Sequence, residues 1–399
     1  MQSTARLPFN ACLLDSGLSG LMRRHKRVCA WTNRVCVWTV AAGLVFSQSM
    51  SGDAGDRYDV IRSGRAMGTH LTMSVSAKNR ETALAASELA RAAIERAETR
   101  LSTWRVGSEL DRLNRTPVGE WVAVSAELEL DLEVALDLAR LTGSAFDPVI
   151  GSLVAAWDLR GNGAIPDRLR LGAAIENTGH ELVELDDGRV RRLQAGATIE
   201  EGGFGKGAGL RDAVTAALAA GAECVRLDLG GQLIMTSPCG PETIDIADPR
   251  DRRAVVGSVV VEGVSVATSG NSVRSLEVGD IQVGHLLDPR IGRPARDWGS
   301  VTVIARDPLK ADCLATALFV MGPERGLTWV DGIEDVEAVF AVIDDDRNVI
   351  LRSTSGIVVR PIVDDDRKGL DRHASVWPEE NEHSPPSQKP VGPSIISFE

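Results

Sequence analysis

Two segments late in the chain combine residue types and spacings that could act on a phosphate group. Residues 285–292 read HLLDPRIG and bring His285 and Asp288 into a turn that contains proline, arginine and glycine. A later apolar run predicts a helix in which Asp312 and Thr316 are four residues apart and share one face. A carboxylate and a hydroxyl together suit a hard cation that prefers oxygen ligands, such as Mg²⁺. We therefore infer a candidate site for phosphate chemistry.

The two polar residues of the predicted helix also have ordinary structural interpretations. A threonine inside a helix usually donates its hydroxyl hydrogen to the carbonyl four residues back, and an aspartate near a helix start usually caps the helix. Spacing alone therefore leaves Asp312 and Thr316 open between a metal site and a structural pair.

A glycine-rich loop supplies a candidate anion site. Residues 200–207 read EEGGFGKG, follow a predicted strand and open a predicted helix. Glycines let the backbone approach a ligand closely, and the free N–H groups at a helix start favour anions, with Lys206 beside them. The loop is not a P-loop, because Glu200 stands in the place of the first glycine and no Ser or Thr follows Lys206. An ordinary strand-to-helix connection with a solvated lysine is the alternative.

Four other turns have a composition that suits ligand contact. Rings in such places can stack on a flat heterocycle, although they more often pack in the core or in the turn itself. These turns are Leu229-Gly230-Gly231, Ala267-Thr268-Ser269-Gly270-Asn271, Ala145-Phe146-Asp147-Pro148 and the segment at Trp104.

The elements that must position these residues are mixed helix and strand. Amphipathic periodicity predicts helices over 81–101, 125–141, 206–220 and 309–320. Short Val- and Ile-rich runs with closely spaced turn residues favour antiparallel hairpins over βαβ crossovers. The predicted strands are 58–64, 70–76, 224–229, 233–236, 243–247, 254–261, 264–268, 282–287, 301–305, 336–343 and 349–353. The sequence therefore predicts an α+β fold, with a mainly antiparallel sheet flanked by helices.

Composition excludes several classes of protein. The 399 residues have a net charge of -12, which argues against a nucleic-acid partner because such a partner needs a basic face. Outside the N-terminal segment the cysteines are Cys224, Cys239 and Cys313, an odd set without metal-type spacing. We therefore expect neither a structural disulfide network nor a zinc site.

The two ends of the chain differ in composition from its middle. Residues 1–55 resemble a leader or export signal, with a basic start at 22–27 and an apolar run at 35–46 that is short for a membrane span. No cysteine follows that run, so a lipid anchor is not expected, and a disordered leader of a cytoplasmic protein is the alternative. Residues 364–399 are rich in Pro, Ser and Glu and predict a disordered tail. The folded domain is expected over 58–361.

Taken together, these segments resemble the FAD:protein FMN transferases, a family of ApbE-like flavin-trafficking proteins. The similarity begins at Met67-Gly68-Thr69, ends at Thr316-Ala317 and covers nearly all of the expected domain. No single motif decides it. In chain order the segments are 67–69, 101–104, 108–114, 146–151, 202–207, 229–231, 268–270, 285–292 and 311–317.

The resemblance implies a T-fold-like enzyme that binds FAD, uses Mg²⁺, moves FMN onto a Ser or Thr of an acceptor protein and releases AMP. Carried over by position, Asp312, Thr316 and the Gly203 carbonyl would hold Mg²⁺, and His285, oriented by Asp288, would assist catalysis. Residues assigned to FAD binding in this way are Met67, Trp104, Ala145, Phe146, Asp147, Lys206, Thr268, Ser269 and Leu286. The acceptor would be an exported or membrane electron-transfer subunit, and the enzyme itself would be periplasmic or associated with the inner membrane.

Some positions depart from the pattern of the family. Glu200-Glu201 stands where Asp-Leu is usual, Trp104 where tyrosine is common, and Arg211 where an aspartate is expected, with Asp212 next to it. None of these changes removes a metal ligand. Two other activities remain open: hydrolysis of FAD to FMN and AMP, and carriage of FAD without catalysis. The choice between Mg²⁺ and Mn²⁺ is open too.

Overall fold

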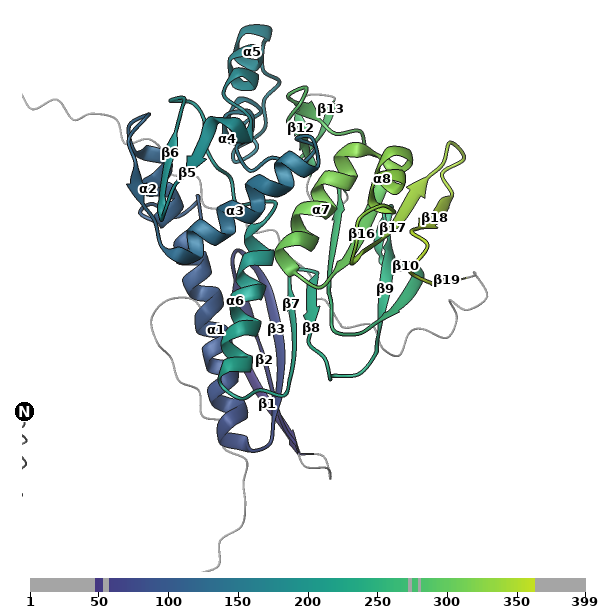
Figure 1. Ribbon diagram of the computed structural model, residues 1–399. Coiled ribbons are helices and arrows are strands. Elements are labelled where there is room, and N and C mark those ends of the chain that lie inside the picture. The colour runs from purple at the N-terminus through teal and green to yellow at the C-terminus, as the bar shows by residue number, and fades with distance from the viewer. Residues whose placement is uncertain (1–46, 53–56, 272–274, 279–280, 363–399) are drawn as a thin grey trace, which may run out of the picture. The chain divides into compact units, whose positions relative to one another are not determined.

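A nine-stranded antiparallel sheet is the centre of the fold (Figure 1). The computed structural model describes residues 47–52, 57–271, 275–278 and 281–362. In spatial order the strands are β1 (Ser47–Gly52), β2 (Tyr58–Ala66), β3 (Thr69–Ala77), β7 (Cys224–Leu229), β8 (Gln232–Met235), β11 (Ser265–Gly270), β16 (Gly299–Ala305), β17 (Val336–Ile343) and β18 (Val349–Ser353).

Smaller sheets flank the main one. Three-stranded sheets are formed by β9 (Glu242–Asp248), β10 (Asp251–Val261) and β19 (Val359–Pro361), and by β4 (Val122–Ala123), β6 (Arg189–Arg192) and β5 (Val183–Leu185). Two hairpins pair β12 (Ser275–Val278) with β13 (Ile281–Gly284) and β14 (Leu287–Asp288) with β15 (Arg293–Pro294). All these pairs are antiparallel.

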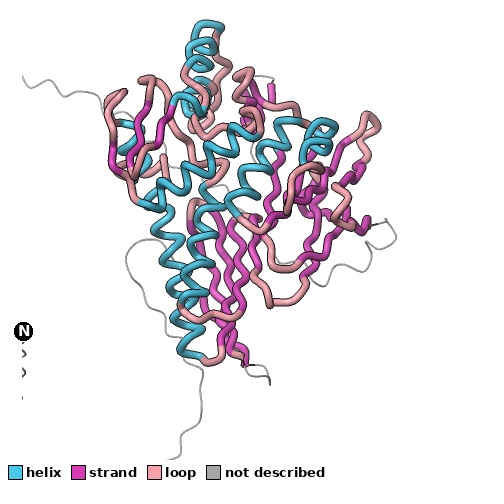
Figure 2. Tube along the Cα trace, in the orientation of Figure 1, coloured by secondary structure: helices cyan, strands magenta, loops and turns pink. Residues whose placement is uncertain are grey.

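Some of the helices pack on the main sheet, and the others pack on neighbouring helices or on the smaller sheets (Figure 2). They are α1 (Arg80–Leu101), α2 (Glu109–Arg115), α3 (Ala126–Leu141), α4 (Gly151–Ala156), α5 (Arg168–Glu176), α6 (Gly205–Ala219), α7 (Pro308–Met321) and α8 (Pro323–Val330), with a 3₁₀ turn at His180–Leu182. Side chains cap several helix starts: Asn79 begins α1, Ser125 begins α3, and Asp307 begins α7 with Pro308 in the first position. Helix α6 begins among glycines without a side-chain cap.

Successive side chains along a strand point to opposite faces of the sheet, so the core is divided between these two faces. In β16, Val301 and Val303 pack in the cluster that includes α7, whereas Ile304 packs with β9 and β10 on the other face. Helices α1 and α6 lie side by side over β2, β3 and β7, where Met73 and Leu210 share a second cluster. The start of α6 and the start of α7 are therefore held on the same side of the sheet.

A buried ion network fixes α6 against its neighbours. Arg100 of α1 donates to Asp131 of α3 at 2.7 Å and to Asp212 of α6 at 2.8 Å. Arg211 of α6 also pairs with Asp131, whose side chain is fully buried. The unusual Arg211-Asp212 pair noted in the sequence thus ties three helices together.

Most predicted elements are confirmed to within a few residues, and several short ones were not predicted. The helices α2, α4, α5 and α8 were missed, as was the β4-β6-β5 sheet. The strand predicted over 282–287 is wrong as a single element, because the chain ends β13 at Gly284 and starts a new hairpin at Leu287.

One structural disulfide is present, although no disulfide network was expected. Cys224 at the start of β7 is bonded to Cys239, with Cα atoms 5.1 Å apart and a sequence separation of 15. The β7-β8 hairpin brings the two together, since Thr236 N donates to Val225 O at 3.0 Å just before Cys239. Cys313 is a buried free thiol.

The ends predicted as leader and tail lie largely outside the described residues. Strand β1 (Ser47–Gly52) falls inside the range predicted as leader, and it pairs with β2 along its whole length. Residues 1–46 and 363–399 are outside the described part, so their predicted roles stay predictions. Among the described helices, none has the length and apolar character that a bilayer span requires.

Candidate functional site

The glycine-rich loop and the late polar helix meet directly. Lys206 Nζ lies 2.9 Å from Asp312 Oδ1, and the backbone N–H of Gly207 donates to Asp312 Oδ2 at 3.0 Å. A Cβ at Gly207 would lie 2.4 Å from the carbonyl oxygen of Pro308, so only glycine allows α6 and α7 to approach this closely. Two segments about one hundred residues apart are therefore in direct contact, as the family resemblance implied.

Asp312 does not cap a helix, and Thr316 does not bond the carbonyl four residues back, so neither ordinary interpretation of these residues holds. Asp307, not Asp312, caps α7. The Thr316 hydroxyl makes no hydrogen bond within the described part of the chain. Six other threonines in helices or at helix ends do donate to the carbonyl four residues back: Thr99, Thr116, Thr142, Thr178, Thr215 and Thr328. The hydroxyl of Thr316 is thus left available for a ligand.

Gly203 lies beside that hydroxyl. A Cβ at Gly203 would be 3.5 Å from Thr316 Oγ1 and 2.9 Å from Phe146 Cε2, so both side chains face this glycine. In a regular first turn the N–H of Gly207 would donate to the Gly203 carbonyl, but here it donates to Asp312. The Gly203 carbonyl accepts no backbone hydrogen bond from the residues that the structure describes.

Met67 lies against the first turns of α6. It occupies the two-residue turn between β2 and β3 with φ +49°, in the left-handed region that suits such hairpins but is unusual for a residue with a long side chain. Its N–H donates to Glu98 Oε2 at 3.1 Å. A Cβ at Gly209 would lie only 2.9 Å from Met67 Sδ, so glycine makes room for the sulfur. The sulfur thus lies near the glycine-rich loop of residues 200–207, called the lysine loop below because it contains Lys206.

The turn at 144–149 is built around a buried carboxylate. Asp147 Oδ2 accepts from His180 N at 2.9 Å and Ser144 Oγ at 3.1 Å, and it lies 3.0 Å from His180 Nδ1. Burial raises the pKa of the Asp147 carboxyl, while the hydrogen bonds from Val149 and His180 act to lower it. Asp147 therefore holds the turn in shape, while Ala145 and Phe146 are buried in the main core cluster. No local pattern in the sequence pointed to His180.

One cluster of potential metal ligands lies apart from Asp312. Ligand atoms of Asp147, His180 and Glu181 lie within 4.8 Å of one another, the one such group among the described residues. The Asp147 oxygens are already engaged by two backbone N–H groups and by Ser144. The Thr316 hydroxyl oxygen, by contrast, has no hydrogen-bond partner within the described part of the chain.

Trp104 is exposed beside the acids of the loop. It is 66% exposed, and its neighbour Thr103 donates through its N–H to Glu201 Oε1 at 3.1 Å and through its hydroxyl to Glu200 and Glu201. Burial raises the pKa of the Glu200 carboxyl, while the charge of Arg160 acts in the opposite direction. These contacts tie the segment at Trp104 to the lysine loop.

The segment of the candidate catalytic histidine packs on the same core cluster as the turn at Phe146. His285 is half-buried after β13, and Leu286 packs against the cluster that contains Phe146. Asp288 accepts three hydrogen bonds from Arg290, from its backbone N at 3.0 Å and from Nε and Nη2 at 2.8 Å each. Arg290 thus supports the turn as expected, and the orientation of His285 by Asp288 stays a prediction.

Strand β11 supplies the remaining predicted residues next to α7. Thr268 Oγ1 lies 2.8 Å from Thr302 Oγ1, and Ser269 pairs with Val301 in the sheet. Thr268 is therefore engaged within the sheet.

Two buried amides lie near these elements: Asn271, which ends the turn 267–271 noted in the sequence, and Gln232, which was not noted. Within the described chain, Gln232 Oε1 and Asn271 Oδ1 are the two buried side-chain atoms without a hydrogen-bond partner. The Gln232 Nε2 group donates to Pro308 O at 2.8 Å, where α7 starts. Gln232 directly follows Gly230-Gly231, and this glycine turn was the feature of the sequence that could have pointed to it.

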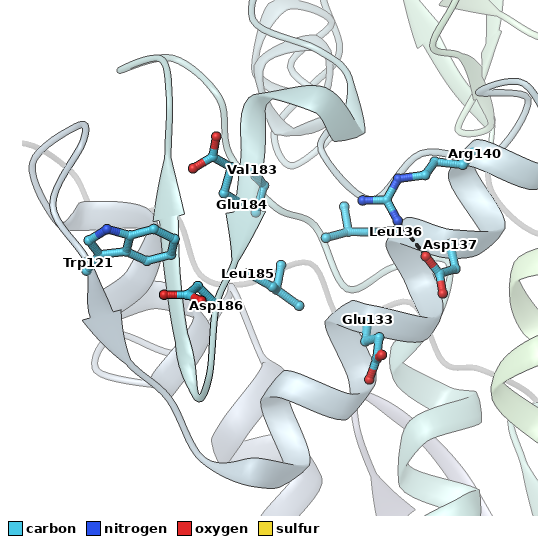
Figure 3. Close-up of a pocket in the computed structure, with 9 residues that line it drawn as sticks. All are labelled: Trp121, Glu133, Leu136, Asp137, Arg140, Val183, Glu184, Leu185 and Asp186. Carbon is cyan, nitrogen blue, oxygen red and sulfur yellow. Dashed lines mark hydrogen bonds and ion pairs between the residues drawn. The ribbon is translucent and has the colours of Figure 1, made fainter.

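A separate cavity of about 440 Å³ lies between α3 and β5 (Figure 3). Figure 3 shows Trp121 on one side and the carboxylates of Glu133 and Asp137 on the other. None of the predicted site residues lines it. The predicted chemistry is therefore not located in this cavity.

Comparisons with known proteins agree on one family. A sequence model of the ApbE family matches residues 67–340. A "FAD:protein FMN transferase" of Klebsiella pneumoniae is 31% identical over 275 residues, which are 67% of this chain and 85% of that protein. A protein of the same name from Treponema pallidum is 31% identical over 363 residues, 84% of this chain and 99% of that protein.

Solved structures give the same result. The flavin transferase ApbE of Vibrio cholerae matches with a TM-score of 0.65 and 27% identity, over 75% of this chain and 98% of that chain. The ApbE protein of Thermotoga maritima matches with a TM-score of 0.67 and 27% identity, over 78% of this chain and 98% of that chain.

Proposed function

The chain belongs to the ApbE family, and we propose that it transfers the FMN half of FAD to a Ser or Thr hydroxyl of an acceptor protein, releasing AMP. The observation that supports this most is the meeting of the glycine-rich loop with α7, where Lys206 pairs with Asp312 and Gly203 lies beside Thr316. A lysine beside a helix start suits a diphosphate, and carboxylate and hydroxyl oxygens suit a divalent cation bound with it.

The chain's own residues would act by positioning and by neutralising charge. The acceptor hydroxyl oxygen attacks the phosphorus on the FMN side, a new O–P bond forms, and the bond from that phosphorus to the bridging oxygen breaks so that AMP leaves. Such transfers depend on alignment and charge compensation. Lys206 would offset the negative charge of the diphosphate oxygens, and His285 would take the proton of the attacking hydroxyl.

The residues present fit a magnesium ion. Asp312, the Thr316 hydroxyl and the Gly203 carbonyl are all oxygen donors, and the latter two have no hydrogen-bond partner described for those oxygens. These three residues would hold the ion. When bound, Mg²⁺ would offset charge on the diphosphate and on the departing AMP. Rates measured with Mg²⁺ and with Mn²⁺ at equal concentrations would decide which metal is preferred.

Export is a separate part of the proposal. The Cys224–Cys239 disulfide supports it, because disulfides persist in oxidising compartments and are rare in the cytosol. We propose a periplasmic or inner-membrane location, with an exported electron-transfer subunit as acceptor. Fractionation of cells that express the full chain tests this. Recovery of the protein only from the cytosol, with Cys224 and Cys239 reduced, would contradict export.

The transfer itself is tested with FAD, Mg²⁺ and a threonine-containing acceptor peptide. The expected result is a peptide heavier by one FMN unit, with one AMP released per labelled peptide and no label when metal is omitted. Free FMN with an unlabelled peptide would instead identify a hydrolase. FAD that stays intact would identify a carrier.

A further inference from the structure

A cation covers one face of the exposed indole of Trp104. The Arg160 guanidinium carbon lies 4.7 Å from the centre of that ring. Arg160 comes from the loop after α4, far in sequence from the helix end that Trp104 follows. A guanidinium over an indole at this distance is a favourable cation–π contact.

Arg160 is held in that place by several acceptors. Its Nη1 donates to the Thr103 carbonyl at 3.1 Å, and its Nη2 donates to the Thr103 hydroxyl and to the Glu200 carboxylate. The side chains of Arg160 and Glu200 are 32% and 17% exposed, so the pair is partly shielded from water. A guanidinium with this many bonds has little freedom to leave the ring.

The other face of the indole is open. Trp104 is 66% exposed although Arg160 covers one of its faces, so the exposed area includes the opposite face. The segment that carries Trp104 adjoins the lysine loop, because Thr103 is bonded to Glu201 and the Glu201 Cγ atom is 3.2 Å from the Cβ position of Gly205, next to Lys206.

We propose that Arg160 is a positioning residue that holds the indole of Trp104 so that its open face stacks on a flat ring of the dinucleotide. The inference rests on the proposed function. An exposed tryptophan without such a contact would sample several rotamers, and ordering it would then weaken binding. With Arg160 in place, the ring is ordered before the ligand arrives.

The chain contains a matched control. The guanidinium of Arg191 lies 4.4 Å from the ring centre of Trp121 and forms an ion pair with Glu184. This arginine–indole–glutamate arrangement repeats that of Arg160, and Trp121 lines the separate cavity of Figure 3. It lies on elements that contain none of the predicted site residues.

The test measures equilibrium binding of FAD to the full chain with Mg²⁺ omitted, so that no turnover occurs. Arg160→Ala is expected to raise the Kd for FAD by about tenfold, and Arg191→Ala to leave it unchanged. Arg160→Lys keeps the charge but has fewer donors, so its Kd should fall between those of the wild type and Arg160→Ala. In the transfer assay Arg160→Ala should raise KM for FAD and keep kcat. FMN and AMP are each used to compete with FAD for the wild type and for Arg160→Ala. The one that binds more weakly to Arg160→Ala contains the stacked ring.

Three results separate this inference from the proposed function. An unchanged Kd in both Arg160 variants would overturn it. An equal loss in Arg160→Ala and Arg191→Ala, with both melting temperatures lowered, would also overturn it, since a general loss of stability would then explain the effect. If the wild type binds no FAD at all, the proposed function fails first and the inference fails with it.

Discussion

The replacement Asp312→Asn separates the chemical role of this residue from its structural role. The asparagine keeps the size of the side chain and an oxygen that can accept the Gly207 N–H bond, now 3.0 Å long. It loses the charge that faces Lys206 Nζ at 2.9 Å. Asp312 is 5% exposed, and the Lys206 side chain is 33% exposed, so the lost ion pair should lower the free energy of unfolding by about 1–2 kcal/mol.

That structural cost is too small to inactivate the protein. Domains are stable by about 5–15 kcal/mol, so nearly all molecules would remain folded after a loss of about 1–2 kcal/mol. The expected fall in kcat is about 10²–10³-fold, the range seen when one stabilising group is removed from a charge-handling site. The assay is the initial rate of peptide labelling at saturating FAD, measured over a series of Mg²⁺ concentrations, together with urea unfolding.

Asp111→Asn is the control for that experiment. Asp111 is 8% exposed and accepts from a backbone N–H, that of Gly107, and from a cation, Arg115, both at 2.8 Å. It should lose similar stability and keep full activity. Labelling by Asp312→Asn at the wild-type rate, or equal loss of activity in the two variants, would refute the reasoning.

Further expectations follow from single contacts. Thr316→Val should lower the rate of peptide labelling at limiting Mg²⁺ by at least about tenfold, whereas Thr316→Ser should keep that rate. Equal rates for Thr316→Val and the wild type would exclude this hydroxyl as a metal ligand. Gly207→Ala should destabilise by about 2–3 kcal/mol in urea unfolding, because its Cβ would lie 2.4 Å from a backbone oxygen of α7; a smaller change would mean that the helices can separate. Burial raises the pKa of the Asp228 carboxyl in the folded protein. The protonated carboxyl therefore contributes stability at acid pH, and this contribution is lost as pH rises through the raised pKa. The stability of the wild type relative to Asp228→Asn should therefore fall from acid to neutral pH, and a difference independent of pH would contradict this. Replacing Cys224 and Cys239 together by serine should cost about 3 kcal/mol for this sequence separation of 15, and an unchanged urea midpoint would contradict a stabilising bond.

The parts of the site that could be predicted depend on local chemistry. Lys206 among glycines at a helix start, and Asp312 four residues before Thr316, are patterns visible in one segment at a time. Their meeting could be inferred only through the family resemblance. The long helices α1, α3, α6 and α7 were predictable because several turns repeat the apolar spacing.

The parts that were missed depend on contacts between distant segments. Helices α2 and α4 have 7 and 6 residues, too few for a helical period to be read. Arg160 reaches Thr103 across 57 residues, and His180 reaches Asp147 across 33. No spacing in the sequence identifies such partners. The disulfide was missed for the same reason, since three cysteines allow several pairings and only the β7-β8 hairpin selects one.

The central claim is that the lysine loop and the α7 face of Asp312 and Thr316 bind the same diphosphate. A crystal structure of the chain with FAD and Mg²⁺ tests it most directly. The account predicts the diphosphate between Lys206 Nζ and the Asp312 and Thr316 oxygens. A dinucleotide bound elsewhere, such as in the cavity beside Trp121, with these three side chains unoccupied, would contradict it.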